Sequence, residues 1–193
     1  MKTTLFSLLL MFASASAAAG VVHFDDLPGA DGGPIAQGYQ GFAWDSLGVI
    51  GPDADVDGYA GSGYAAGAVS PANVAYNLDG ATAAVRSTSG FHFVGAYFTS
   101  AWLEQELAFD GWRNGKLLYS SSGSYLIGSA TPRWIALDWS GIDTLTIYNS
   151  SGTQWAMDDF TVPEPGSLGL LGACLAGLAL VRRRQGRGEA AGV

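Results

Sequence analysis

The chain has 193 residues, of which 13% are charged, 28 are glycine and six are tryptophan, a composition that excludes a helical bundle and suits short strands joined by tight turns. Residues 20–162 hold 15 carboxylates against four cationic side chains, a net charge of −11, which makes nucleic acid a poor partner. The single cysteine, Cys174, lies in an apolar C-terminal run, so residues 20–162 contain no disulfide and no cysteine-based metal site.

The N-terminal residues 1–19 have the organisation of a secretory signal peptide. Lys2 precedes an apolar run at residues 5–13, and small residues follow it. Signal peptidase requires small side chains before the cut, and cleavage after Ala15, Ala17 or Ala19 satisfies this rule. We therefore expect export, with residue 20 beginning the mature domain if cleavage follows Ala19.

Nine or ten short segments between residues 20 and 162 have strand-like composition, with Gly, Pro, Asn or Asp between them. Asn114 and Gly115 separate two of them and predict a β-hairpin, because both turn residues need a positive φ. The segments are 21–26, 39–44, 74–77, 83–87, 91–100, 105–112, 116–121, 134–139, 144–148 and 155–162. No long stretch has a helical period, and residues 51–67 suggest an irregular loop. We predict an all-β, antiparallel β-sandwich over residues 20–162.

An acidic stretch in this loop is the sharpest local motif. Asp53, Asp55 and Asp57 alternate and are followed by Gly58, which resembles the first half of an EF-hand calcium loop. The twelfth position of that loop is Tyr64 instead of the usual glutamate, so an EF-hand is not expected. The stretch is then either an irregular Ca²⁺ loop or a solvated acidic loop.

Aromatic side chains are candidates for sugar binding, because a π surface stacks on the apolar face of a pyranose ring. Trp102 and Trp112 lie beside predicted turns and are the best candidates for exposed ligand-binding residues, although tryptophans also fill sandwich cores. Glu104 and Glu106 could in principle form the carboxylate pair of a glycosidase, but alternation places both on one strand face, which is typical of a solvated surface. We therefore predict no catalytic residue and no enzymatic activity.

The C-terminal tail has three parts in a fixed order. Pro163, Glu164 and Pro165 come first, the uncharged run 166–181 follows, and Arg182, Arg183 and Arg184 close it. The run would span about 24 Å as a helix, which makes it a short transmembrane segment. The three arginines would act as a membrane stop signal that keeps residues 185–193 on the cytoplasmic side.

This tail resembles the PEP-CTERM sorting signal of Gram-negative bacteria that make exopolysaccharide, a C-terminal signature that has also been labelled an ice-binding protein C-terminal domain. The resemblance implies that a membrane enzyme, exosortase, cuts at or near Pro163–Pro165 after a transient membrane anchoring. The mature domain then passes to the cell surface or the extracellular matrix. The alternative is an ordinary, permanent membrane anchor.

The strand pattern is similar to a jelly roll of the galactose-binding or carbohydrate-binding-module type. In such a fold the first and last strands are neighbours, which would place Asp25 and Asp26 near Asp158 and Asp159. Four carboxylates together repel one another without a counter-ion, so this cluster is a candidate site for a structural Ca²⁺ ion. In the alternative, one aspartate of each pair caps a turn and the other faces solvent.

Three functional hypotheses follow from these features. The first is an exported, surface-sorted, non-enzymatic protein that binds or resides in extracellular polysaccharide. The second is a structural matrix or adhesion domain without a small ligand, and the third is a secreted glycoside hydrolase. An open aromatic platform would favour the first, burial of every tryptophan the second, and a cleft with paired carboxylates the third.

Overall fold

The computed structural model describes residues 19–29, 32–51, 59–163 and 177, and its strands account for most of the described chain. The strands are β1 (Ala19–Val22), β2 (Gly33–Pro34), β3 (Ala43–Asp45), β4 (Leu47–Ile50), β5 (Val74–Asn77), β6 (Ala83–Ser100), β7 (Gln105–Arg113), β8 (Lys116–Ser120), β9 (Tyr125–Ile127), β10 (Arg133–Asn149) and β11 (Trp155–Pro163). Three short helical segments accompany them, η1 (Tyr39–Gly41), α1 (Gly63–Gly67) and η2 (Leu78–Gly80). The predicted all-β class is confirmed.

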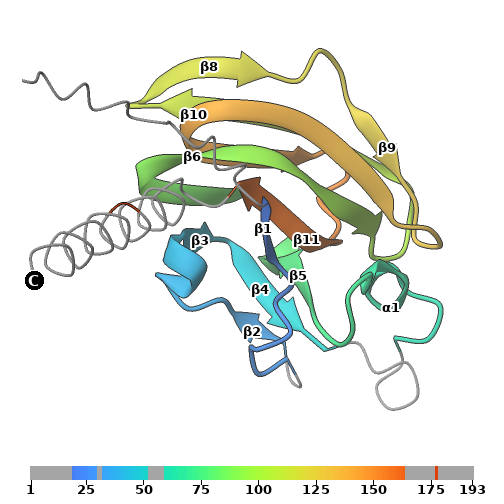
Figure 1. The fold of residues 1–193 in the computed structure, drawn as a ribbon. Coiled ribbons are helices and arrows are strands. Elements are labelled where there is room, and N and C mark those ends of the chain that lie inside the picture. The colour runs from blue at the N-terminus through green and yellow to red at the C-terminus, as the bar shows by residue number, and fades with distance from the viewer. Residues whose placement is uncertain (1–18, 30–31, 52–58, 164–176, 178–193) are drawn as a thin grey trace, which may run out of the picture. The chain divides into compact units, whose positions relative to one another are not determined.

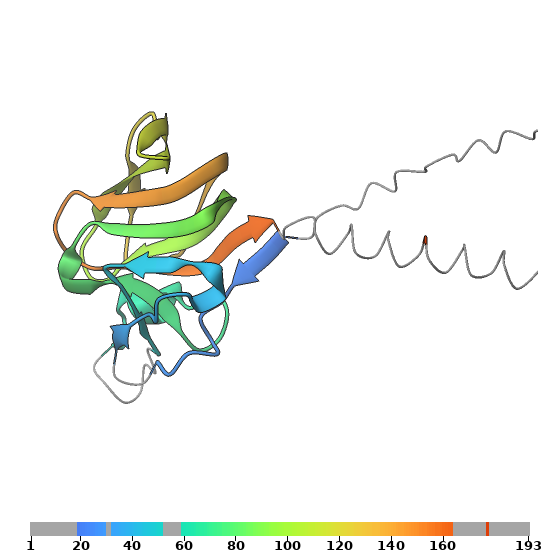
Figure 2. The ribbon, with the colours of Figure 1, turned by 90° about the vertical axis from the view of Figure 1, so that its left-hand side faces the viewer.

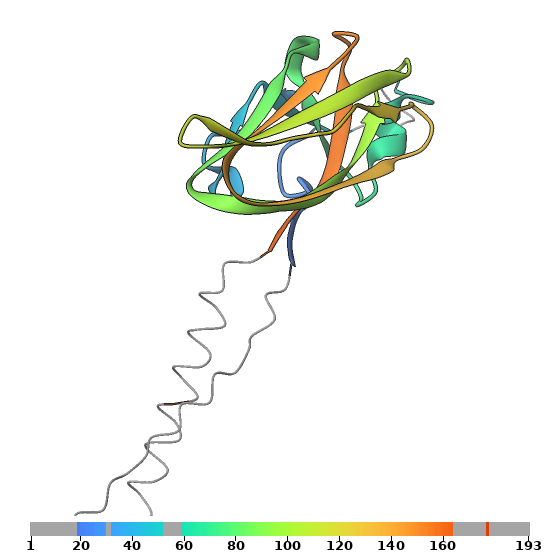
Figure 3. The same cartoon turned by 90° about the horizontal axis from the view of Figure 1, so that it is seen from above.

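Hydrogen bonds join the strands in the order β2-β4-β5-β11-β6-β10-β7-β8, with β1 on β11, β3 on β6 and β9 on β7. Every one of these pairings is antiparallel. The long strands β6 and β10 are curved, and the set folds over into two layers, with β6, β8 and β10 above and β2, β3 and β4 below in Figure 1. Figure 3 shows the curvature of these strands from above. The fold is therefore an antiparallel β-sandwich.

The two longest strands each unite two segments that were predicted to be separate. Strand β6 contains both 83–87 and 91–100, and β10 contains both 134–139 and 144–148. Gly90 and Gly141 lie between the predicted segments, and each adopts a positive φ, 76° and 73°, within its strand. The register between β6 and β10 shifts at three places along this stretch, so bulges bend the strands without ending them.

Three further predictions needed correction at their boundaries. Segment 39–44 is not one strand, because Gln40 and Gly41 have positive φ values and form η1 before β3 begins. The first strand stops at Val22, since Phe24 has a φ of 65°. The predicted loop 51–67 contains the short helix α1, whose Gly63 packs so closely against the backbone of Ser100 that a Cβ would clash.

The hairpin prediction is confirmed at Asn114 and Gly115. Their φ values are 51° and 73°, and the turn pairs Arg113 of β7 with Lys116 of β8. Both central residues are thus left-handed, as a two-residue hairpin requires. Asn114 also borders a surface depression.

Aromatic rings form the centre of the core, with Phe160 of β11 at the middle. Phe160 is fully buried, and its ring centroid lies 4.9 Å from that of Phe93, 5.5 Å from Trp44 and 5.7 Å from Phe42. These rings come from the beginning, the middle and the end of the domain. The last strand therefore completes the core.

Two buried tryptophans differ in their hydrogen bonding, which gives a stability prediction. Trp44 Nε1 donates to the carbonyl of Tyr39 at 2.9 Å, whereas Trp155 Nε1 has no partner among the described residues. Trp44→Phe loses a hydrogen bond, and Trp155→Phe removes an unpaired buried donor, while both lose similar ring volume. Urea unfolding should show that Trp44→Phe costs about 1–2 kcal/mol more than Trp155→Phe. Equal costs would contradict this prediction.

Candidate functional site

The pairing of the first and last strands, which was predicted, brings a small polar cluster together. Val21 pairs with Thr161 and Val22 with Phe160, and β1 lies beside β11 in Figure 2. His23 follows β1 directly, and its Nδ1 lies 2.6 Å from Oδ1 of Asp159. Asp159 has a φ of 53° at a shift in the β11–β6 register, and this irregularity turns its side chain toward His23.

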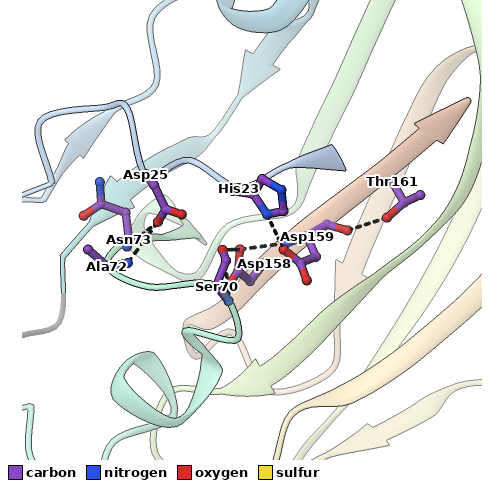
Figure 4. Close-up of polar contacts among 8 residues, drawn as sticks. All are labelled: His23, Asp25, Ser70, Ala72, Asn73, Asp158, Asp159 and Thr161. Carbon is purple, nitrogen blue, oxygen red and sulfur yellow. Dashed lines mark hydrogen bonds and ion pairs between the residues drawn. The ribbon is translucent and has the colours of Figure 1, made fainter. Parts of the chain in front are cut away.

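Asp158 lies next to this pair and is fully buried. Its Oδ2 accepts the backbone N–H of Ser70 at 2.8 Å, and its Oδ1 accepts the Ser70 hydroxyl at 3.0 Å and the backbone N–H of Asp159 at 2.7 Å. Burial raises the pKa of Asp158 to about 6, against the lowering effect of the hydrogen bonds from Ser70 and Asp159. Asp158 thus ties β11 to the segment that precedes β5 (Figure 4).

The other two predicted carboxylates have partners of their own. Asp25 Oδ1 accepts the backbone N–H groups of Ala72 and Asn73, each at 3.0 Å. Asp26 Oδ1 accepts the hydroxyl of Tyr39 at 2.6 Å. Burial and the neighbouring Asp26 raise the pKa of the Tyr39 hydroxyl, which therefore remains a donor at neutral pH. Asp25 and Asp158 both hold residues 70–73, whereas Asp26 fixes η1.

Only part of the predicted carboxylate cluster can therefore share an ion. His23, Asp158 and Asp159 each offer a ligand atom, and these atoms lie within 4.8 Å of one another. Asp25 and Asp26 do not belong to this group, and Asp53, Asp55 and Asp57 lie outside the described residues. Ca²⁺ prefers six to eight oxygen ligands, more than the four oxygens of the two carboxylates in this group, and an imidazole suits transition metals better. The calcium hypothesis stays a prediction.

The cluster also contains a serine, a histidine and carboxylates, the residue types of a nucleophilic triad. The Ser70 hydroxyl, however, donates to Asp158, while His23 Nδ1 contacts Asp159. No hydrogen bond joins Ser70 to His23 among the described contacts, so the histidine does not act on the serine in this arrangement. The geometry instead suits a structural role that joins both ends of the domain to residues 70–73.

His23 and Ser70 are the members of this cluster that sequence reasoning missed. His23 precedes Asp25 by two residues, so the predicted pairing of the terminal strands could have included it. Ser70 gave no sequence signal, because its contact with Asp158 joins residues 88 positions apart.

The buried carboxyl of Asp158 should make the free energy of unfolding depend on pH. Its carboxyl titrates near 3.8 in the unfolded chain and near 6 in the folded protein, so the folded state binds the proton more tightly and stability falls as pH rises from about 4 to 6. We expect Asp158→Asn to remove this part of the pH dependence, measured as unfolding free energies at pH 5 and pH 7. The exposed control Asp79→Asn keeps Asp158 and should keep the wild-type difference. An unchanged difference in Asp158→Asn would contradict the assignment.

The tryptophans divide between the core and the surface. Trp44 and Trp155 are buried, whereas Trp102, in the β6–β7 connection, is 52% exposed. Trp112 on β7 is half-buried and Trp134 on β10 is 38% exposed. Trp102 is therefore exposed and Trp112 only partly so, and the role of either in ligand binding stays a prediction.

The remaining polar candidates lie on the surface. Glu104 and Glu106 are both exposed, in agreement with the solvated-face interpretation. His92 lies in the hydrophobic strand β6 but is not a core residue, because its ring is partly exposed and Nε2 lies 2.6 Å from Oδ1 of Asp138. Asp138 has a φ of 54° at one of the shifts in the register between β10 and β6.

The end of the last strand meets the first residue of the predicted sorting motif. Pro163 is the final residue of β11 and pairs with Ala19. Glu164, Pro165, Arg182, Arg183 and Arg184 lie outside the described residues, as does the predicted segment 166–181 except for Gly177. Within the described parts of the chain, no helix has the length and apolar character needed to cross a membrane.

Comparison with known protein families gives one finding about this tail. The model of the PEP-CTERM protein-sorting motif matches residues 161–184. Searches of curated proteins and of solved structures gave no match. The chain therefore carries a PEP-CTERM sorting motif, as the order of its tail predicted, and the match begins inside β11.

Proposed function

We propose that this protein is exported, anchored briefly by its tail, cut by an exosortase near Pro163–Pro165, and left at the cell surface as a non-enzymatic domain associated with extracellular polysaccharide. The sorting motif supports export and membrane-associated sorting. The polysaccharide partner is the part of the proposal that goes beyond this support. It follows from the resemblance of the tail to a signal found in exopolysaccharide producers and from the exposed aromatic side chains.

The observation that carries the proposal is the position of the motif relative to the core. The last aromatic residue of β11 is the fully buried Phe160, and the motif match starts at residue 161. A cut near Pro163 would therefore leave every fully buried aromatic side chain of the described residues in the released part. Such a product keeps the complete core while losing the tail, which is the behaviour required of a cargo domain.

The test is binding of the protein to polysaccharide from the same cells. The protein, recovered from the surface fraction of its native host, should co-sediment with purified exopolysaccharide of that host, without releasing reducing sugar over hours. Release of reducing sugar would favour the glycoside hydrolase, and Glu104→Gln with Glu106→Gln would then locate the activity. Failure to co-sediment would favour the structural matrix or adhesion domain.

The same preparation tests the calcium hypothesis. An ion that binds the folded state alone raises Tm as its concentration increases. If Ca²⁺ raises Tm after treatment with EDTA and Asp159→Asn abolishes the shift, the ion lies at the His23–Asp158–Asp159 cluster. If neither EDTA nor Ca²⁺ changes the Tm of the wild type, the calcium hypothesis is wrong.

A further inference from the structure

A row of directly paired residues crosses the outward face of the strands β6, β10 and β7. Arg86 of β6 pairs with Thr144 of β10, and Thr144 pairs with Trp112 of β7. Directly paired residues project from the same face of a sheet. Val85 precedes Arg86 and Leu145 follows Thr144, and both are fully buried in the core. The row therefore points away from the core, toward solvent.

A second aromatic ring lies on this face. Thr146 and Tyr148 share it with Thr144, because alternate residues of a strand project to one side. Tyr148 is 37% exposed, and its hydroxyl donates to Oδ2 of Asp110 at 3.1 Å. Asp110 is itself the partner of Thr146 across β10 and β7. The face thus combines the rings of Trp112 and Tyr148 with hydroxyl and carboxylate groups between them.

An open depression of about 550 Å³ adjoins the row. Arg86 and Thr144 border it, together with Gly38 and Gly41 from the segment around η1. Both glycines have positive φ values, and a Cβ at either position would meet no atom within 4 Å. Side chains are therefore missing where they would fill the depression, whose size suits a small ligand or one unit of a polymer.

The polar groups of the depression are fixed as both donors and acceptors. The backbone N–H of Asn114 donates to Oδ2 of Asp143 at 2.5 Å, and Thr144 Oγ1 donates to Oδ1 at 3.0 Å. These bonds, with that of Asn114 the largest effect, hold the pKa of Asp143 below its ordinary value, so it is an ionised acceptor at neutral pH. Arg86 supplies donors and forms an ion pair with Asp45. Sugar hydroxyls, which both donate and accept, match such a set.

Charge is nearly balanced on this face, unlike in the rest of the domain. Three of the four cationic residues of 20–162 lie on it or at the β7–β8 turn that borders it, together with four carboxylates. They are Arg86, Arg113, Lys116, Asp45, Glu106, Asp110 and Asp143. Of the net charge of −11, the remaining residues of 20–162 therefore carry −10. A neutral polymer meets no repulsion from this distribution, whereas a polyanion is repelled by the domain as a whole.

We propose that this outward face binds a neutral hexose polysaccharide, with Trp112 and Tyr148 stacking on two separate sugar rings of one chain and the depression holding the hydroxyls of another unit. The inference rests on the proposed function and names the part of the domain that carries it. The C–H face of a hexose packs on an aromatic ring, while its equatorial hydroxyls reach the polar groups at the ring edge. Trp102 lies before β7, at the opposite end of that strand from Trp112, and takes no part.

The test compares Trp112→Ala and Tyr148→Ala with the matched control Trp102→Ala, each as the full chain expressed in the native host and recovered from the surface fraction. Calorimetry measures the binding of soluble hexasaccharides of glucose, galactose or mannose. It also measures the binding of polygalacturonate and of the host's own exopolysaccharide. We expect Trp112→Ala and Tyr148→Ala each to weaken binding of a neutral glycan about tenfold or more, the scale of a truncated aromatic anchor. Trp102→Ala should stay within about twofold of the wild type.

A second measurement covers the case in which Trp112→Ala unfolds. In the wild type, titration with the bound oligosaccharide should shift the indole N–H resonance of Trp112 and leave that of Trp102 unchanged. If the wild type binds a glycan but only Trp102→Ala weakens binding, the proposed face is wrong while polysaccharide binding stands. Tighter binding of polygalacturonate than of every neutral glycan would overturn the neutral ligand. No binding of any probe, including the host polysaccharide, would overturn the proposed function itself.

Discussion

Phe160→Ala is expected to destabilise the domain by about 3–5 kcal/mol, a large fraction of the stability of a domain this size. Phe160 is fully buried, and its ring contacts Phe93, Phe42 and Trp44 from three different strands or connections. Removal of the ring leaves a cavity that these rigid aromatic neighbours cannot fill. Urea unfolding followed by tryptophan fluorescence measures the loss.

Two further variants make this prediction specific. Phe160→Leu keeps much of the volume and should cost clearly less than Phe160→Ala. Leu103→Ala changes a side chain that is 67% exposed and should stay within about 0.5 kcal/mol of the wild type. A Phe160→Ala variant as stable as Leu103→Ala would show that β11 does not complete the core, and the argument for release of an intact domain would fail with it.

Replacement of Pro163, Glu164 and Pro165 by alanine is expected to keep most of the protein in the membrane fraction, whereas the wild type is recovered mainly from the surface or the medium. The sorting-motif match covers these residues, and exosortase is expected to recognise them before it cuts. Without the cut, the apolar run 166–181 and the arginines after it remain attached. Cell fractionation and immunoblotting measure the distribution.

The control for this variant changes a residue outside the motif. Glu106 is exposed on β7, and Glu106→Ala should be distributed as the wild type is. If the variant with three alanines reaches the surface at the wild-type level, the Pro-Glu-Pro sequence does not direct processing. Retention of the wild type in the membrane would instead favour a permanent anchor.

Local signals in the sequence were sufficient where the structure depends on local geometry. Asn114 and Gly115 predict their hairpin because two adjacent residues determine the turn. The sorting motif was likewise readable, since its three parts follow one another in the chain. The pairing of β1 with β11 came from the expected architecture, and the structure confirms it.

The features that could not be predicted from the sequence depend on contacts between residues far apart in the chain. Gly90 and Gly141 look like turn residues, and only the pairing of β6 with β10 shows that they are bulges. The contact of Ser70 with Asp158 joins distant positions and redirects a carboxylate that was expected to meet Asp25. The outward face likewise follows from the register of three strands, which no local pattern reveals.

In the proposed processing, both ends of the chain are removed and the β-sandwich is delivered to the surface. The most direct test is the intact mass of the protein purified from its native host, measured separately for the surface or medium and for the membrane fraction. We expect a surface species that begins near Gly20 and ends near Pro163, a stretch that keeps Phe160 and the rest of the aromatic core. A surface species that retains Cys174 and the three arginines would contradict it, because the tail would then be a permanent anchor.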